Sequence, residues 1–404
     1  MGDIPTNIVG LLLAAILVAL AARRLRLPYT VGLVAAGVAL ALMRLQTGAL
    51  LTHDLILRLI LPPLLFEAAL LMPWPELRRD LPVVLALSTL GVVIATATVT
   101  WGMVAWLRWP LAPALILGVL ISATDPVSVI ALFKDLGLTG RLRFLVESES
   151  LMNDGVAAVL FAVVLAWVNA GPGAGAVHAI PPTFIAAQFL LTAGGGAALG
   201  LACGAAAIAM AGRTADHLVE TALTLVAAYG SFYLADFLHA SGVLATVTCG
   251  ILMGNLGILR GDAEPTISAQ GRQAVLGFWD FAAFLMNSLV FLLIGLAVAG
   301  LKLTSLYPAT MAAIIGLVLL GRALTVYPIC LVFRGSRLAV PMAAQHVLWW
   351  GGLRGALGLA LALSLPETLP WRDDILIATF GVVIFSVVVQ GLTMAPLLRV
   401  LKLR

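Results

Sequence analysis

The stretch SATDPVSVIALFKDLG, residues 122–137, interrupts a long apolar run at Asp125 and Pro126. A proline has no backbone N–H and disfavours helical geometry at the residue before it, which predicts a break in a helix over 111–133. The sequence GGLRG at 351–355 predicts a second break, because glycine weakens a helix. Paired interrupted helices in the two halves of a chain are typical of the substrate site of a secondary transporter.

Outward from these breaks, the whole chain consists of apolar segments. Its residues are 62% hydrophobic and 10% charged, whereas a soluble globular chain carries about 25% charged residues. Crossing a bilayer takes roughly 20 apolar residues, and thirteen segments reach about that length: 6–22, 28–44, 55–72, 81–107, 111–133, 143–169, 183–211, 216–237, 241–259, 273–300, 304–333, 339–364 and 373–398. The sequence therefore predicts an all-α membrane protein with about 13 transmembrane helices, forming a single domain over 1–404.

The distribution of basic residues predicts the topology. With the N-terminus outside, sixteen of the 23 Lys and Arg residues fall on the inner side and five on the outer side, as the positive-inside rule requires. The C-terminus is then cytoplasmic, and residues 1–22 are expected to form a first span rather than a cleaved signal. Six helices on either side of a linking helix predict inverted repeats, with helices 5 and 12 unwound where they cross.

Composition also bounds location and partners. A chain of this hydropathy is expected in the inner or plasma membrane of a cell, with the lipid bilayer as its main partner. The net charge of +4 comes from loops that flank the membrane, and it gives no reason to expect nucleic-acid binding.

The densest polar group in a predicted span is VESESLMNDG, residues 146–155. The helix period places four of its residues on one face: Glu149, Ser150, Asn153 and Asp154. Asp154 lies eleven residues beyond Arg143, which is near mid-membrane at about 1.5 Å per residue. A carboxylate beside hydroxyl and amide oxygens suits an alkali cation. The alternative is a polar stripe that only joins helices.

Two basic residues within predicted spans have natural partners. Glu149 beside Asp154 needs a counter-charge, which Arg322 near the middle of helix 11 can supply. Arg354 and Asp125 lie at the two breaks, where exposed helix ends carry partial charges. The arginine is expected near free carbonyls and the aspartate near free amides. A purely structural charge compensation explains both equally well.

Other classes of membrane protein lack support in the sequence. A hydrolase would need a catalytic Ser/His or paired-Asp motif at membrane depth. A channel would need a repeated pore segment, and a nucleotide-driven pump would need a phosphate-binding loop. None of these patterns is present, so we predict a transporter that is not an enzyme and has no cofactor beyond the ions it carries. A cation channel is the remote alternative.

Six stretches carry a resemblance to a known family: LPPLLFEAAL (61–70), SATDPVSVIALFKDLG (122–137), VESESLMNDGVAAVLF (146–161), SGVLATVTCGILMGN (241–255), GRALTVYP (321–328) and GGLRGALGLALALSLP (351–366). Together they resemble the bacterial NhaP-type sodium/proton antiporters, which are related to the animal sodium/proton exchangers. The resemblance implies exchange of Na⁺ or Li⁺ for H⁺ by alternating access, serving sodium transport and pH homeostasis. Exchange of K⁺ for H⁺ is the alternative.

The resemblance also implies an organisation in two parts. A dimerisation part would comprise approximately 1–80 and 183–300, and the protein would be a homodimer. An ion-transport bundle that moves against it would comprise approximately 81–169 and 304–400. The chain ends at Arg404, so regulation by a cytoplasmic tail, which many relatives have, is not expected.

The family's functional residues can be matched to this chain. Asp154 is implied to bind the cation and the proton in turn, with Thr124 and Ser150 as further Na⁺ ligands. Asn153 stands where electrogenic relatives have a second aspartate, which implies electroneutral one-for-one exchange. Asp125, next to Thr124 in the ATDP motif, belongs to the same predicted ion-binding group.

The resemblance assigns a different role to the remaining charges of the bundle. Glu149 and Arg322 match a stabilising ion pair of the family, which does not itself carry the transported ion.

Overall fold

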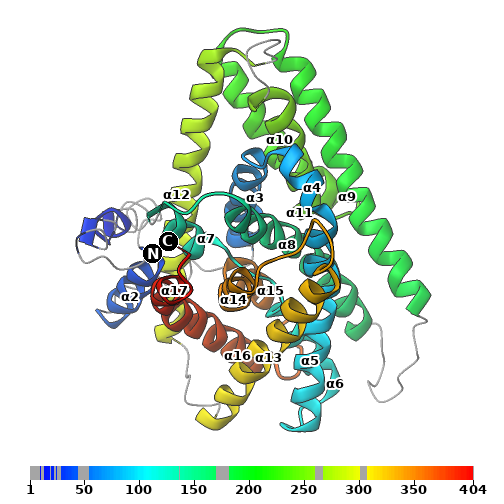
Figure 1. The fold of residues 1–404 in the computed structure, drawn as a ribbon, viewed down its shortest axis with the longest axis vertical. Helices are drawn as coiled ribbons and strands as arrows, with labels where there is room; N and C mark the ends of the chain where they lie inside the picture. The colour runs from blue at the N-terminus through cyan, green and yellow to red at the C-terminus, as the bar shows by residue number, and fades with distance from the viewer. Residues whose placement is uncertain are drawn as a thin grey trace. The chain divides into compact units, whose positions relative to one another are not determined.

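The chain is helical throughout the part that the structure describes. The computed structural model describes residues 29–43, 54–135, 137–169, 182–259, 267–300 and 307–403, together with 10, 13–18, 20, 21 and 24. Every regular element in these ranges is an α-helix or a π-helical turn, and Figure 1 draws the helices as coiled ribbons. The predicted first segment, 6–22, lies partly outside the described residues, since 6–9, 11, 12, 19 and 22 are not among them.

Long apolar helices account for most of the described chain. Five of them are α8 (Arg141–Asn169), α9 (Pro182–Ala211), α10 (His217–Phe237), α12 (Ala269–Gly300) and α13 (Pro308–Val332). Two more long helices are each interrupted by a π-helical turn. The first runs through α4 (Trp74–Leu85), η2 (Ala86–Leu90) and α5 (Gly91–Ala105). The second runs through α16 (Arg372–Phe385), η5 (Ser386–Gln390) and α17 (Gly391–Val400). These seven described helices are long and apolar enough to cross a membrane, and the chain is a multi-pass membrane protein.

Shorter helices lie between the long ones. They are α2 (Tyr29–Leu42), η1 (Leu55–Ile60) with α3 (Leu61–Leu70), and α11 (Gly242–Met253) with η3 (Gly254–Ile258). Two predicted spans are each split into half-helices, namely α6 (Leu111–Leu120) with α7 (Val127–Asp135) and α14 (Met342–Trp350) with α15 (Ala356–Leu363). Both predicted helix breaks are therefore confirmed.

The helix bounds follow the apolar segments of the sequence closely, with one exception. The predicted fourth segment begins at 81, whereas α4 begins at Trp74. Pro75 and Glu76 occupy the first turn, where a proline loses no hydrogen bond and an acidic side chain faces the positive helix end. Polarity alone therefore placed this boundary too late.

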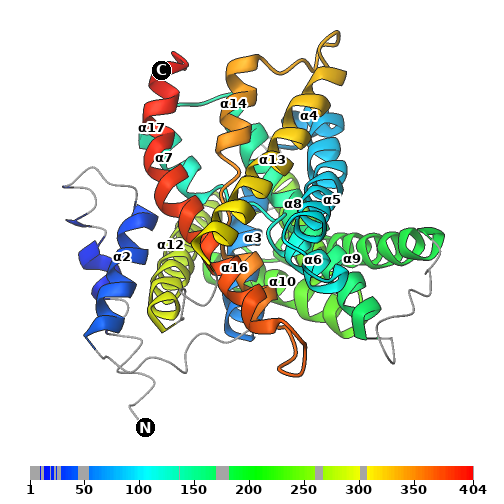
Figure 2. The same ribbon diagram turned by 90° about the horizontal axis from the view of Figure 1, so that it is seen from below.

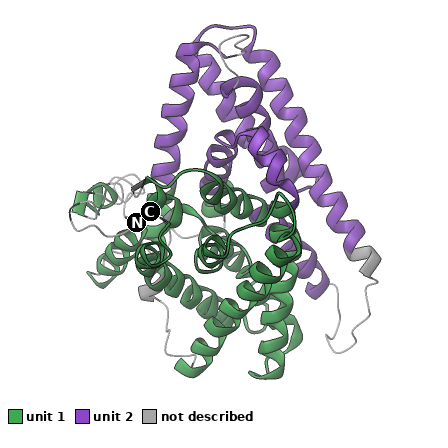
Figure 3. Ribbon diagram, viewed as in Figure 1, with its two compact units in different colours: residues 1–58, 83–153, 287–404 green, residues 59–82, 154–286 purple. Residues whose placement is uncertain are grey.

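Packing divides the chain into two compact units, which Figure 3 colours separately. Unit 1 comprises Met1–Arg58, Val83–Asn153 and Asn287–Arg404, and unit 2 comprises Leu59–Pro82 and Asp154–Met286. The divisions fall inside η1, α4, α8 and α12, so each of these elements contributes to both units. The predicted assignment of a dimerisation part and an ion-transport bundle concerns function and stays a prediction.

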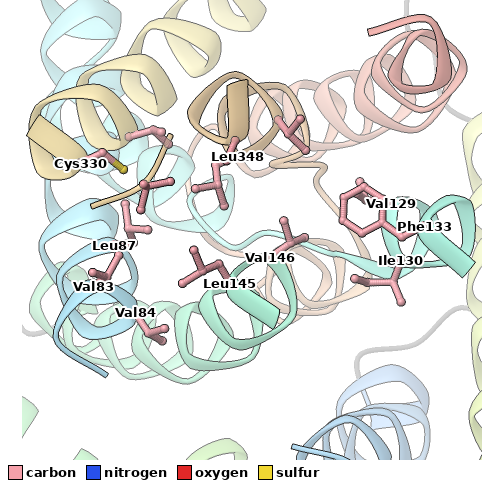
Figure 4. Close-up of a cluster of buried hydrophobic side chains, with 14 of the residues drawn as sticks. Val83, Val84, Leu87, Val129, Ile130, Phe133, Leu145, Val146, Cys330 and Leu348 are labelled. Atoms are coloured by element: carbon pink, nitrogen blue, oxygen red, sulfur yellow. The ribbon is translucent and has the colours of Figure 1, made fainter. Parts of the chain in front are cut away.

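An apolar cluster in unit 1 fixes the helices that carry the two breaks. Figure 4 shows the cluster, in which α4 contributes Val83, α7 Phe133, α8 Leu145 and α14 Leu348. In a bilayer such packing acts through van der Waals contact, since lipid is as apolar as these side chains. The half-helices α7 and α14 also both contact α17, which lies beside them in Figure 2.

Small residues bring α5 close to α6 and α13. A Cβ added at Gly118 of α6 would lie 2.8 Å from Thr100 Oγ1, and one added at Gly321 of α13 would lie 3.3 Å from the Ala95 backbone. Thr96 Oγ1 donates to Gly118 O at 3.4 Å. Close approach at small residues is typical of membrane helices, and here it holds α6, which ends at the first break.

Unit 2 is held together by buried polar contacts as well as apolar ones. Trp279 of α12 lies 4.7 Å from Phe66 of α3, between ring centroids, and its Nε1 donates to Thr224 of α10 at 2.8 Å. The buried Glu220 carboxylate accepts from Ser268 N at 2.9 Å and from Ser268 Oγ at 2.7 Å. A carboxylate is stabilised at the N-terminus of a helix, so Glu220 anchors the start of α12 to α10.

Candidate functional site

The two helix breaks lie against each other in unit 1. The first break comprises the unwound residues 121–126 between α6 and α7, and the second comprises 351–355 between α14 and α15. The Asp125 N–H donates to Leu353 O at 2.7 Å. This bond satisfies one backbone group of each unwound segment at the point where the two segments meet, as buried backbone in a membrane requires.

Charged side chains lie at the ends of the half-helices, where backbone groups lack partners within the helix. Arg354 Nη1 donates to Ser122 O at 2.8 Å and to Ala123 O at 3.1 Å. The Asp125 carboxylate accepts from the Val127 N–H at 2.9 Å and from the backbone of Ala356. The Arg354 guanidinium thus lies at the carboxyl end of α6, and the Asp125 carboxylate lies at the amino ends of α7 and α15. The partial charges of these helix ends favour both placements. A direct role of either residue in transport stays a prediction.

Close approach of charged side chains accounts for the glycines of the second break. A Cβ added at Gly352 would lie 2.7 Å from Arg322 Nε, and one added at Gly355 would overlap the Asp125 carboxylate. The sequence suggested helix weakening as the reason for these glycines. Their steric role is more specific, because they leave room for a guanidinium and a carboxylate against the unwound backbone.

Polar side chains of α8 hold the first break. Ser150 Oγ donates to Thr124 O at 2.8 Å, and Thr124 Oγ1 lies 2.8 Å from Ser150 Oγ. Asn153 Nδ2 donates to Ser122 O and to Thr124 Oγ1, both at 3.1 Å. A hydroxyl has one hydrogen, so with Ser150 donating to Thr124 O, the Thr124 hydroxyl donates to Ser150. The result is a buried chain of three directed hydrogen bonds that brings three predicted site residues together.

One oxygen of this network has no hydrogen-bond partner among the described residues. It is Asn153 Oδ1, which is buried, on a side chain that is 2% exposed. Leaving a buried acceptor unsatisfied costs about 1–3 kcal/mol, so this oxygen is available to a ligand. Asp154 follows directly in α8 and is half-buried. It comes four residues after Ser150, which places both on one face of the helix.

A second carboxylate of α8, that of Glu149, is held by a buried arginine. Arg322 Nη1 and Nη2 each donate to one carboxylate oxygen of Glu149 at 2.7 Å, and the side chains are 5% and 2% exposed. Arg322 Nε and Nη2 also donate to Leu348 O, at 3.1 and 2.9 Å. The bidentate pair therefore links α8 to the carboxyl end of α14 and keeps Glu149 with Arg322.

Three residues that contact the breaks were not identified as site residues from the sequence: Ser122, Ser386 and Gln390. Ser386 and Gln390 are the only polar residues between 380 and 392, and a spacing of four places them on one helix face. That pattern could have identified them. Ser122 contributes its backbone oxygen, for which a sequence carries no signal.

Comparisons with known proteins agree on one family. The profile of the family described as "Sodium/hydrogen exchanger, transmembrane" matches residues 9–400. The Na⁺/H⁺ antiporter ApNhaP of Aphanothece halophytica is 39% identical over 379 residues, covering 94% of this chain and 70% of that protein. The Na⁺/H⁺ antiporter NhaH of Halobacillus aidingensis is 34% identical over 417 residues, covering 99% and 98%. The solved structure of the sodium proton antiporter MjNhaP1 from Methanocaldococcus jannaschii has the same fold, with a TM-score of 0.76 at 21% identity over 97% of this chain and 98% of that one.

Proposed function

The chain belongs to the sodium/hydrogen exchanger family, and on this premise we propose that it is a secondary antiporter that exchanges Na⁺ or Li⁺ for H⁺. One structural observation carries the proposal. The hydroxyls of Thr124 and Ser150 meet at an unwound segment inside a helical membrane protein, directly before the Asn153-Asp154 pair of α8. Oxygen ligands of this kind suit a hard alkali cation better than a transition metal.

The cation would take over oxygens that now bond to one another. Thr124 Oγ1 and Ser150 Oγ share a hydrogen bond, and rotation of their hydroxyl hydrogens would free lone pairs for a cation. Asp154 would supply the charge, with Asn153 Oδ1 as a further oxygen. Asp125 has its carboxylate on backbone amides of two helix ends, which favours a supporting role for it within the predicted ion-binding group.

Competition for a single carboxylate gives exchange without a separate gate for each ion. A proton and a cation both neutralise Asp154, and they cannot occupy it together. The ionised, empty site is costly to bring into an apolar barrier, whereas either loaded site is neutral. The bundle would therefore change its access from one side of the membrane to the other only when loaded, and each passage of a cation would be followed by return of a proton.

The charges around the site favour one-for-one exchange. Asn153 is neutral, and the charges of Glu149 and Arg322 cancel within their pair. Asp154 is then the carboxylate whose charge changes, and one Na⁺ or one H⁺ neutralises it equally. Exchange should proceed at the same rate with and without an imposed membrane potential. Acceleration by the potential would refute the stoichiometry while leaving the competition at Asp154 intact.

Topology and assembly complete the proposal. The basic residues support an outer N-terminus and a cytoplasmic C-terminus in an inner or plasma membrane, and the family resemblance supports a homodimer. Single cysteines introduced near residues 2 and 403 should react with an impermeant label from opposite sides. Reaction of both from one side would contradict the topology, and a monomeric mass in detergent would contradict the dimer.

The decisive experiment is exchange by the purified protein in proteoliposomes with Na⁺, Li⁺ and K⁺ supplied separately. Asp154→Asn should abolish exchange while the protein remains folded. The control is Asp236→Asn, which neutralises an exposed carboxylate of α10 and should retain wild-type exchange. Full activity of Asp154→Asn would refute the proposed site. Exchange of K⁺ in preference to Na⁺ would instead establish the alternative substrate.

A further inference from the structure

The helix that follows the broken pair α14 and α15 contains a π-helical turn, η5 (Ser386–Gln390), between α16 and α17. A π-helical turn inserts one extra residue into an α-helix and is frequent at functional sites. Its first and last residues, Ser386 and Gln390, are polar and buried in an otherwise apolar stretch. Burying polar side chains in a membrane helix is costly unless they find partners.

Both side chains find their partners at the two ends of the second break. Gln390 Nε2 donates to Trp350 O, the last carbonyl of α14, at 2.9 Å. Ser386 Oγ accepts from the Arg354 N–H at 3.0 Å. The Ser386 hydroxyl also lies 2.9 Å from Val383 O in its own helix, which can take its hydrogen. One face of η5 therefore holds residues 351–355 from both ends.

The first break is held in a similar way. Ser150 and Asn153 lie in α8, the helix that follows α6 and α7, and they bond to Thr124. Ser386 and Gln390 lie in the helix that follows α14 and α15. Each broken helix is thus held by a serine and a carboxamide from the next helix along the chain.

The contacts of η5 reach the first break through one side chain. The Arg354 backbone is fixed by Ser386, and the Arg354 guanidinium donates to Ser122 O and Ala123 O. Those carbonyls directly precede Thr124. A shift of the second break would therefore move the hydrogen-bond donors that fix the backbone of a proposed cation ligand.

We propose that Ser386 and Gln390 are positioning residues for cation exchange. They hold the second break so that Arg354 can fix the carbonyls next to Thr124. The inference rests on the proposed antiport, since it assigns a role in that activity to residues that do not touch the ion.

The kinetic test uses Gln390→Leu and Ser386→Ala in proteoliposomes. Each removes a hydrogen bond to a buried backbone group, so we expect kcat/KM for Na⁺ to fall by about fivefold or more, mostly through a higher KM, because the ion site is distorted. Ser386→Thr keeps the hydroxyl and should restore exchange to within about twofold of wild type. The matched control is Thr379→Val, which removes a buried hydroxyl of α16 whose one hydrogen bond among the described residues is to Ile375 O in its own helix, and it should leave kcat/KM unchanged.

Hydrogen exchange of a peptide covering 351–355 tests the same contacts without transport. Its amides should exchange faster in Ser386→Ala and Gln390→Leu than in wild type, by about fivefold, and not in Thr379→Val. Wild-type kcat/KM in both variants, each folded by its melting temperature, would overturn the positioning role. If a variant cannot be reconstituted, wild-type rates of amide hydrogen exchange in this peptide, measured in detergent, would overturn the positioning role as well. Absence of cation exchange by the wild type would refute the proposed antiport itself, and faster amide exchange in the variants would still show the contacts of η5.

Discussion

The first and second breaks are built from the same parts but carry different charges. Each is an unwound segment between half-helices, held by a serine and a carboxamide of the next helix. The carboxamide of the first, Asn153, is followed by Asp154, whereas that of the second, Gln390, is followed by Gly391. The second break carries Arg354, whose guanidinium is engaged by carbonyls of the first. The first break therefore has a neighbouring carboxylate, which we propose to bind the ion, and the second has a guanidinium that holds carbonyls of the first.

The largest effect is expected from breaking the ion pair that links α8, which holds the first break, to the carboxyl end of α14, where the second break begins. Arg322→Ala leaves Glu149 charged and buried and also frees Leu348 O. Losing one member of a buried pair costs about 3–5 kcal/mol, so the melting temperature in detergent should fall well below that of wild type. Glu149→Gln keeps the contact to Leu348 O and should fall less. Equal and small shifts for both variants would show that the pair does not support the bundle.

A smaller effect is expected from separating the breaks by steric means. Gly355→Ala would drive a methyl group into the Asp125 carboxylate, and overpacking of this kind costs about 1–3 kcal/mol. Exchange should fall at least tenfold, a change of about 1.4 kcal/mol in activation free energy. Gly316→Ala is the control, because a Cβ there meets nothing within 4 Å. Normal exchange by Gly355→Ala would show that the two breaks need not be in contact.

The next effect is confined to the first break. Thr124→Val removes the hydroxyl that links Asn153 to Ser150, and a cation would lose one ligand. We expect the apparent Na⁺ affinity to fall by about tenfold, or roughly 1.4 kcal/mol, while Thr124→Ser stays near wild type. Titration of exchange rate against Na⁺ concentration measures this. Equal affinities of the two variants would remove Thr124 from the ligand set.

The smallest effect is expected at the exposed rim of the second break. Trp350 Nε1 donates to Thr393 Oγ1 at 2.8 Å, in an exposed position. Thr393→Val should change stability by no more than about 0.5 kcal/mol, as is usual for surface substitutions, and exchange by less than twofold. A loss as large as that expected for Gln390→Leu would mean that the hydroxyl of Thr393, and not the face of η5, holds the end of α14.

The sequence predicted where the two breaks occur, because their causes are local. Pro126 and the glycines of 351–355 act on their own backbone and can be read directly. The shared face of Ser150, Asn153 and Asp154 follows from the helix period in the same way.

The contacts between the breaks could not be predicted. Hydrogen bonds from the Arg354 guanidinium to Ser122 O and from the Arg354 N–H to Ser386 Oγ join segments that are more than 30 residues apart and involve backbone atoms. Helix period shows which face of a helix is polar, but it does not show which neighbour that face meets. The steric need for Gly355 has the same origin, because it depends on where the Asp125 carboxylate lies.

The central claim is that a cation and a proton compete for Asp154. It is tested most directly by measuring the apparent KM for Na⁺ in proteoliposomes over a series of pH values, equal on both sides of the membrane. Where protons occupy the site, mass action predicts that KM rises roughly tenfold for each unit by which the pH falls, while the maximal rate at saturating Na⁺ changes little. A KM for Na⁺ that stays constant across the series would contradict the claim.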